Sequence, residues 1–196
     1  SVPIEETLEA LQELIKEGKV RHIGVSNETA WGIMQYFRGH HEKNLPRIQS
    51  IQNPYSLIMR EYETALSEIS FKERLSLLVY SSLSFGVLTG KYLGQESFPK
   101  GSRFDYAKGR NAPRYNPPEA QPAIKAYVNL AKKYELDPAQ MAISFVLSRA
   151  FVTSTIIGAT SLQQLKTDIE SVDIKLIDEI LEEIEALHKK YPNPIS

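Results

Sequence analysis

The sequence predicts an α/β fold in which the strands of a parallel sheet alternate with covering helices. Short runs rich in β-branched and aliphatic residues recur along the chain, and a segment with apolar residues at helical spacing follows each of them. The clearest run, at 75–81, is mostly apolar, which is typical of a strand buried on both faces. Four strand–helix units of this kind match half of an eight-unit (β/α)8 barrel, the TIM barrel, followed by C-terminal helices.

Three of the predicted strands lie in the first part of the chain. Pro3 lies near the start of the first predicted helix and Gly18 near its end. Asn27 is a plausible cap for the second helix, and Asn53 followed by Pro54 is expected to end the second strand. The predicted helices are at about 4–15, 27–37 and 62–69, and the predicted strands are at 19–26, 47–52 and 75–81.

The second part begins with an irregular stretch from about Gly86 to Pro118. Loops this long are uncommon in compact domains and are often functional. The stretch is therefore interpreted as a lid that orders over a bound ligand, with a permanently ordered loop as the alternative. Asp137, with Pro138 and Gln140 after it, is a strong helix start. A fourth strand is expected at 153–159, with helices at about 124–130, 138–146, 161–171 and 176–190.

Composition excludes several classes of protein. The chain has 196 residues, of which 42% are hydrophobic and 24% charged, and its net charge is −1. These values are ordinary for a soluble globular protein and give no electrostatic footprint for nucleic acid or a membrane surface. The absence of cysteine excludes disulfides and thiolate metal sites and fits a reducing, cytoplasmic compartment. The four histidines have no metal-ligand spacing, so no metal site is predicted.

Candidate ligand-binding residues follow the predicted strands. In parallel α/β folds, ligands bind beyond the carboxyl ends of the strands. This set of side chains suits hydrogen bonding to an uncharged polar group and stacking on a flat ring, and it contains no acid–base or nucleophile–base pair. The strand ends carry Ser26, Asn27, Gln52, Asn53, Tyr80, Ser81, Ser82, Leu83, Gly158, Ala159, Thr160 and Ser161.

Each of these residues also has a purely structural interpretation. Asn27 can serve only as a helix cap, and Gln52 can belong to the turn at Asn53 and Pro54. Tyr80 stands at a strand end, where a tyrosine is usually a core residue. Ser161 is a natural cap for its helix whatever else it does, and the N-terminus of that helix would also favour a phosphate.

Four segments resemble motifs of the aldo-keto reductases, and they occur in that family's order. GKVRHIGVSN at 18–27 and QNPYSL at 52–57 resemble two of them, the second being the segment after the sixth barrel strand. YSSLSFGVLTGKY at 80–92 resembles the segment after the seventh strand, and IGATSLQQL at 157–165 the segment after the eighth. Together the matches cover nearly the whole chain, and the likeness is to the bacterial Tas-like branch, which is related to potassium-channel β-subunits.

The resemblance implies a cytoplasmic oxidoreductase that reduces an aldehyde or ketone with NADPH. By their positions in the motifs, Ser26, Asn27 and Gln52 would hold the nicotinamide carboxamide, and Tyr80 would stack on the nicotinamide ring. The path of the pyrophosphate and the 2′-phosphate would be formed by Ser81, Leu83, Gly86, Lys91 and Arg103. The adenosine end would be formed by Gly158, Thr160, Ser161, Gln164 and Asp168.

Two departures from the family pattern matter. Where the family commonly has Glu-Asn after Gln-Leu, this chain has Thr167 and Asp168, and an Asp accepts from an adenine amino group but does not donate as Asn does. The family's catalytic Asp, Tyr, Lys and His lie on the first four strands, before the residue numbered Ser1, so no catalytic residue is assigned. Residues 1–196 are therefore interpreted as the C-terminal part of a single barrel domain, which is inactive without the N-terminal half.

Two functions from different classes remain open. The first is an enzyme that acts on a small carbonyl substrate, with NADP(H) as cofactor and with neither nucleic acid nor membrane as a partner. The alternative is a nucleotide-binding regulatory subunit on the same fold with little or no turnover. A sugar- or phosphate-metabolising barrel of another family agrees less well with four motifs in register. A catalytic tetrad in the full-length sequence would favour the enzyme.

Overall fold

The computed structural model describes residues 2–195. These residues divide into two compact units. The first consists of residues 2–53 and 62–78, and the second of residues 54–61 and 79–195. Strand–helix alternation runs through both units, so the expected α/β class is confirmed.

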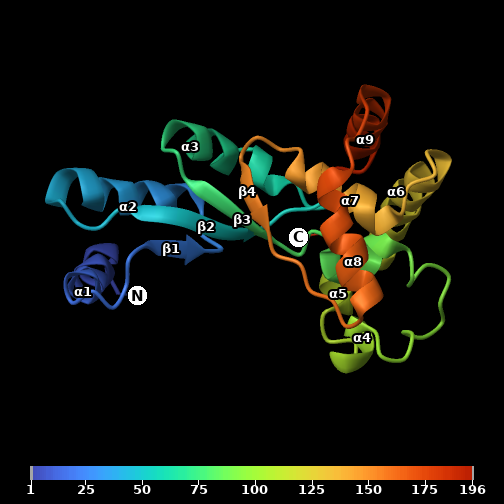
Figure 1. Cartoon of the computed structure of the whole chain (residues 1–196), viewed down its shortest axis with the longest axis horizontal. Coiled ribbons are helices and arrows are strands. Elements are labelled where there is room, and N and C mark those ends of the chain that lie inside the picture. The colour runs from blue at the N-terminus through green and yellow to red at the C-terminus, as the bar shows by residue number, and fades with distance from the viewer. Residues whose placement is uncertain (1, 196) are drawn as a thin grey trace. The chain divides into compact units, whose positions relative to one another are not determined.

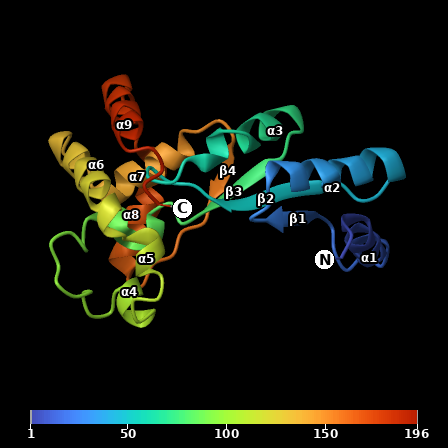
Figure 2. The same ribbon diagram turned by 180° about the vertical axis from the view of Figure 1, so that it is seen from behind.

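The first unit is a parallel strand pair with helices beside it. Ile23 pairs with Ile48, and after an irregularity in the register Gly24 pairs with Ser50 and Ser26 with Gln52. In both views α2 runs alongside β2 (Figures 1 and 2). The elements are α1 (Ile4–Lys16), β1 (Ile23–Ser26), α2 (Ala30–Lys43), β2 (Ile48–Pro54, whose last residue is in the second unit), a 3-10 turn (Glu61–Glu63), α3 (Leu66–Lys72) and the beginning of β3 (Ser76–Tyr80).

Local sequence explains where α1 and α2 begin and how they pack. Pro3 precedes α1, where a missing backbone N–H costs nothing. The hydroxyl of Thr29 accepts a hydrogen bond from the Gly32 N–H at 3.1 Å and caps α2. The two helices pack against each other, and Leu8 of α1 and Phe37 of α2 are fully buried.

The cap of α2 corrects one prediction. Asn27 does not cap the helix, because its backbone is left-handed, with φ of 58°. Its N–H instead donates to the side-chain oxygen of Asn53 at 2.8 Å, which links the end of β1 to the next strand of the same unit.

The second unit is mainly helical and is centred on α7. In this unit the Ile156 N–H donates to the carbonyl of Val79 at 2.7 Å, which joins the end of β3 to the chain after β4. Helix α7 contacts α6, α8 and β4 (Figure 2). The elements are 3-10 turns at Ser84–Thr89, Pro118–Ala120 and Ser171–Asp173, helices α4 (Arg103–Tyr106), α5 (Ala112–Tyr115), α6 (Gln121–Lys133), α7 (Pro138–Leu147), α8 (Leu162–Glu170) and α9 (Asp178–Lys190), and strand β4 (Val152–Thr155).

The start of α7 agrees with its prediction. The Asp137 carboxylate accepts from the backbone N–H groups of Ala139 and Gln140 at 2.8 and 3.2 Å. The side chain of Gln140 does not complete a capping box and donates instead to the Thr167 carbonyl at 3.3 Å. The core of the second unit lies around this helix, where Phe145 is fully buried.

The stretch from Gly86 to Pro118 is more ordered than expected. It contains α4 and α5, and five aromatic rings contact one another along it. The cluster consists of Phe85, Tyr92, Phe98, Phe104 and Tyr115. Both interpretations of the segment, a lid and a permanently ordered loop, stay predictions, and protection from hydrogen exchange on ligand binding separates them.

The ends of several strands differ from those expected. β1 begins only at Ile23, β2 continues through Asn53 and Pro54, and β4 ends at Thr155. In β3 buried residues alternate with half-buried ones, so the expectation of burial on both faces is wrong. Pro54 ends its strand rather than interrupting it, which agrees with the tolerance of proline at strand margins.

Candidate ligand-binding site

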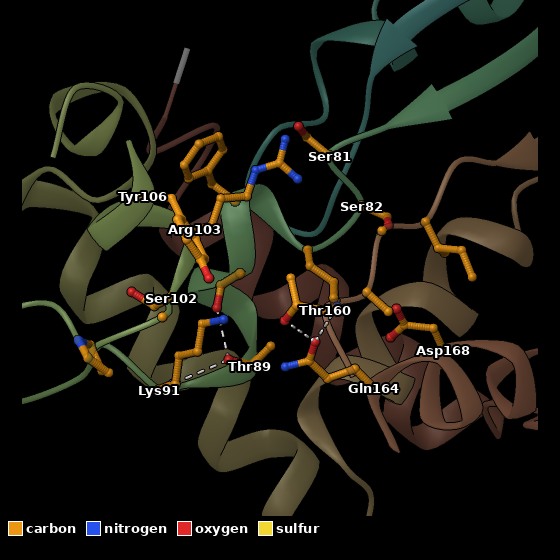
Figure 3. Close-up of a pocket in the computed structure, with 18 of the residues that line it drawn as sticks. Ser81, Ser82, Thr89, Lys91, Ser102, Arg103, Tyr106, Thr160, Gln164 and Asp168 are labelled. Atoms are coloured by element: carbon orange, nitrogen blue, oxygen red, sulfur yellow. Dashed lines mark hydrogen bonds between the residues drawn. The ribbon is translucent and has the colours of Figure 1, made fainter. Parts of the chain in front are cut away.

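A cavity of about 650 Å³ in the second unit brings together the ends of two strands and the segment around α4. Its walls come from the turn after β3, from residues 99–106, and from the loop between β4 and α8. Figure 3 shows Lys91 and Arg103 on one side of it and Thr160, Gln164 and Asp168 on the other. The cavity therefore combines cations with an amide and a carboxylate.

The turn after β3 is held in an unusual backbone conformation. Ser81, Ser84 and Phe85 have φ of 57°, 47° and 62°, values that residues with a Cβ adopt rarely. The Ser84 hydroxyl shares a buried 2.7 Å hydrogen bond with that of Ser56, which anchors the turn. Such clusters of left-handed residues persist only where the surroundings enforce them, and they are common at ligand sites.

Gly86 allows a lysine to lie over this turn. Its φ is 90°, and a Cβ added to it would lie 3.1 Å from both Cε and Nζ of Lys91. The missing side chain therefore gives Lys91 its place beside the cavity. The Thr89 hydroxyl donates to the Gly86 carbonyl at 2.9 Å and accepts from the Lys91 N–H at 3.3 Å, which fixes the turn between them.

Three cations line the cavity without a carboxylate partner. Lys91, Lys100 and Arg103 all contribute to its wall. None of them forms an ion pair with another residue of the described range 2–195. Unpaired cations around one cavity attract anions, and an arginine guanidinium matches the geometry of phosphate oxygens.

The loop before α8 is built by Ser161 and Gln164. The Ser161 hydroxyl accepts from the Gln164 N–H at 3.2 Å, so its predicted role as a helix cap is confirmed. The side-chain oxygen of Gln164 accepts from the N–H and the hydroxyl of Thr160 at 2.9 and 3.0 Å (Figure 3). The amide nitrogen of Gln164 has no hydrogen bond within the described chain, so it is left as a donor for a ligand.

Asp168 lies one turn further along α8. Its side chain lines the cavity, the residue is only 7% exposed, and it makes no hydrogen bond to any described residue. Burial raises the pKa of this carboxyl, and the negative charge of Asp137 raises the pKa further. A buried carboxylate without a partner is costly, so this position favours a ligand that donates a hydrogen bond to it.

Three of the predicted site residues lie in the first unit and form a cluster there. The Ser26 hydroxyl donates to the Gln52 carbonyl at 2.9 Å, and the amide of Asn27 donates to the Ser26 hydroxyl at 3.1 Å. The end of β1 thus carries two adjacent polar side chains, one of which contacts the main chain at the end of β2, and the role of these residues in holding a carboxamide stays a prediction.

Most of the other predicted site residues line the cavity. They are Tyr80, Ser81, Leu83, Gly86, Lys91, Arg103, Gly158, Thr160, Gln164 and Asp168. Ser161 is absent from the lining, because its side chain caps α8. Among the lining residues that the prediction missed are Phe85, Thr89, Lys100, Ser102 and Tyr106. Phe85 and Thr89 lie within the motif at 80–92, and the other three belong to the long stretch, from which only Gly86, Lys91 and Arg103 were predicted.

Residues 2–195 lack the features of a metal centre and of a membrane-spanning helix. The described residues contain no cluster of three His, Cys, Asp or Glu side chains that could hold a metal ion. None of the helices in the same range is long and apolar enough to cross a membrane.

Comparison with known proteins extends these observations. The model of the aldo/keto reductase family matches residues 1–189. Protein Tas of Escherichia coli is 48% identical over 194 residues, which cover 99% of this chain and 55% of Tas. A putative voltage-gated potassium channel subunit beta of Schizosaccharomyces pombe is 29% identical, over 95% of this chain and 56% of that protein.

Other relatives bear on the cofactor and on the fold. An NADH-specific methylglyoxal reductase of Escherichia coli is 28% identical, over 90% of this chain and 51% of that protein. The solved structure of a glycerol dehydrogenase from Gluconobacter oxydans matches with a TM-score of 0.76 at 24% identity, over 98% of this chain and 56% of that one. The α/β fold is thus that of TIM-barrel-like reductases, and the chain spans about half the length of these relatives.

Proposed function

The chain belongs to the aldo/keto reductase family of oxidoreductases, and on that premise we propose that it carries the cofactor-binding part of an enzyme that reduces an aldehyde or ketone with NADPH. The observation that carries the proposal is the cavity of the second unit. It offers three unpaired cations and, across from them, a buried carboxylate without a partner. This combination fits a ligand with phosphate groups at one part and a hydrogen-bond donor such as the adenine amino group at another.

The side chains of the cavity divide the binding of such a cofactor. Lys91, Lys100 and Arg103 would neutralise phosphate oxygens. The free amide nitrogen of Gln164 would donate to an acceptor of the adenine ring, and Asp168 would accept from its amino group. Ser26, Asn27 and Gln52 of the first unit remain the proposed partners of the carboxamide, with Tyr80 as the proposed stacking residue.

The chemistry comes from the cofactor and from outside the described chain. A bound reduced nicotinamide supplies the hydride that reduces the carbonyl carbon. No residue of this chain matches the family's catalytic Asp, Tyr, Lys or His, so the proton for the carbonyl oxygen would come from another part of the full-length protein. The residues described here bind and orient the cofactor. The absence of cysteine supports a cytoplasmic setting for the reaction.

Cofactor preference provides the direct test. NADPH should bind the full-length protein about tenfold more tightly than NADH, because unpaired cations are available for the 2′-phosphate. Titration of nicotinamide fluorescence with each cofactor measures this. Arg103→Met should lower the preference, whereas Arg110→Met, which removes a cation outside the cavity lining, should leave it unchanged. Equal affinity for both cofactors would contradict the proposed NADPH preference. Tighter binding of NADH, the cofactor in the name of the NADH-specific relative, would contradict it as well.

The alternative, a nucleotide-binding regulatory subunit, draws support from the relative that is a putative potassium channel subunit. Turnover separates the two functions. An enzyme should oxidise NADPH in the presence of an aldehyde such as 4-nitrobenzaldehyde at a rate well above that without aldehyde. Tight NADPH binding with no aldehyde-dependent oxidation would favour the regulatory subunit.

We also propose that these residues are the last four strand–helix units of one barrel domain, and that a preceding half completes it. An exposed apolar stripe along α8 and the 3-10 turn after it supports this. Leu162 and Ile169 are 86% and 57% exposed, and Leu165 and Val172 continue the stripe at helical spacing. Exposed apolar surface of this extent normally marks an interface.

The isolated fragment tests this partnership. Residues 1–196 expressed alone should self-associate and should reduce no carbonyl substrate. The full-length protein should not self-associate in this way and should reduce a carbonyl substrate. Sedimentation velocity and aldehyde-dependent NADPH oxidation measure the two properties. A monomeric fragment that turns over an aldehyde would show that the chain folds and reacts without a preceding half.

A further inference from the structure

The guanidinium of Arg103 lies over the aromatic ring of Phe85. Its central carbon is 4.6 Å from the ring centroid, which is within the range of a cation–π interaction. Phe85 also stacks on Tyr115, with centroids 5.2 Å apart and an interplanar angle of 13°. The Tyr115 hydroxyl is in turn 3.4 Å from the Ser81 hydroxyl at the cavity wall. Arg103 thus rests on an ordered aromatic surface that belongs to the same wall.

The place of Arg103 is defined by this ring rather than by a carboxylate. Arg103 has no ion pair within residues 2–195. It begins a helix of only four residues, and its guanidinium reaches towards the loop before α8, because a Cβ on Gly158 would lie 3.9 Å from its Nη1. A long side chain in solvent samples many rotamers, so a contact that restricts it changes what it offers to a ligand.

The backbone of Phe85 adopts a conformation that favours glycine over a bulky residue. Its φ of 62° and ψ of 17° lie in the left-handed region, which is unfavourable for a bulky residue. Gly86, the next residue, also has a positive φ, and a glycine at position 85 would satisfy the turn at less cost. The turn accepts a phenylalanine where glycine is favoured, and the ring it gains contacts Arg103 and Tyr115.

We propose that Phe85 is a positioning residue, which holds the Arg103 guanidinium across the cavity for a phosphate group of the ligand. This proposal rests on the proposed function, since it concerns the same site. Phe85 itself lines the cavity, and on this proposal its effect on binding passes through Arg103, because the ring limits the orientations of the guanidinium before the ligand arrives. A guanidinium that is already oriented loses less conformational freedom when it pairs with phosphate oxygens.

A purely structural role for Phe85 makes a different prediction. Phe85 also contacts Phe104, which is fully buried, so its replacement could loosen the whole segment. In that case affinity would fall by the same factor whether or not Arg103 is present. A role through Arg103 predicts instead that the effect disappears once the guanidinium is removed. A double-mutant cycle measures this difference.

The cycle uses the full-length protein with NADPH as the probe and nicotinamide fluorescence as the readout. Phe85→Met keeps a side chain of similar volume without a ring, and Arg103→Met removes the guanidinium. Phe85→Met should weaken NADPH binding about two- to fivefold, which corresponds to about 0.5–1 kcal/mol. In the Arg103→Met background the same replacement should change the affinity by less than about 1.5-fold. Phe85→Tyr, which keeps the ring, should retain the wild-type affinity.

Phe98→Met is the matched control. Phe98 contacts Phe104 and Tyr92 in the same cluster but is neither in contact with Arg103 nor part of the cavity lining. Its replacement should leave NADPH affinity unchanged, and thermal unfolding of each variant shows whether the protein still folds. If Phe85→Met fails to fold, the affinity of Phe85→Tyr decides, and a loss in that variant would overturn the proposal.

Failure of the proposal and failure of the proposed function give different results. If the wild-type protein does not bind NADPH, the proposed function is wrong. If it binds NADPH but Phe85→Met has no effect, or an equal effect in both backgrounds, only the role of Phe85 is wrong.

Discussion

Replacement of Asp168 by asparagine should stabilise the protein in the absence of a ligand. The carboxylate is 7% exposed and has no hydrogen-bond partner within the described chain. Asparagine has nearly the same shape but no charge, so Asp168→Asn removes the charge while leaving the packing of α8 intact. The change therefore isolates the cost of burying this carboxylate.

The structure indicates the size and the sign of the effect. Leaving a buried polar group unsatisfied costs about 1–3 kcal/mol, and the new amide is itself unpartnered, so a gain of about 1 kcal/mol is expected at pH 7. For a domain of this size that gain raises the melting temperature by about 2–4 °C. Because the pKa of Asp168 is raised in the folded state, the wild-type protein is penalised where the carboxyl is ionised. The penalty should be absent below the ordinary pKa of an aspartate and should appear as the pH rises through the raised value.

Thermal unfolding of the full-length wild-type and variant proteins between pH 3 and pH 8 measures this difference. The advantage of Asp168→Asn should be largest at neutral pH and should vanish at the acidic end. NADPH binding should change little, because the asparagine side chain keeps an oxygen that accepts from the adenine amino group. A variant that is no more stable at pH 7, or whose advantage does not depend on pH, would refute the reasoning.

Three glycines provide further predictions. Gly86→Ala should weaken NADPH binding about tenfold, because the new methyl group would displace Lys91. Gly94→Ala is the control, since Gly94 has a similar positive φ of 69° but open space around it. This control should lose about 1–2 kcal/mol of stability without a change in affinity. Fluorescence titration and thermal melts of both variants check this, and an equal loss of affinity in both would contradict it. Gly24→Ala should destabilise the protein by about 1–3 kcal/mol, because its Cβ would lie 2.9 Å from the backbone oxygen of Ser50. If the variant melts at the wild-type temperature, the two strands can move apart without cost and the prediction is wrong.

The elements that the sequence predicted correctly are those governed by local rules. The start of α7 follows from the Asp137 side chain and the proline after it, which act within one turn. The predicted cap of α2 was wrong, because Asn27 and Thr29 are both good caps by residue type. The choice between them depends on the left-handed backbone of Asn27 and its contact with Asn53, which is 26 residues away.

The candidate site was predictable where it follows strand ends and unpredictable where it depends on tertiary contacts. Ser81 and Thr160 line the cavity because the ends of neighbouring strands converge. The burial of Asp168 could not be predicted, because it is produced by the packing of α8 in the second unit. The contact of Phe85 with Arg103 joins residues 18 positions apart through a segment with no periodic pattern, so no spacing rule indicates it.

The aromatic cluster of Phe85, Tyr92, Phe98, Phe104 and Tyr115 has a consequence for the time course of binding. The rings pack the segment around α4 into one cluster with Phe85 of the cavity wall, so we expect this wall to be in place before the ligand arrives. Association should then follow a single exponential whose rate rises linearly with ligand concentration, with no plateau from a slow closing step. The residence time of the ligand would then be set by the contacts it makes rather than by the opening of a gate.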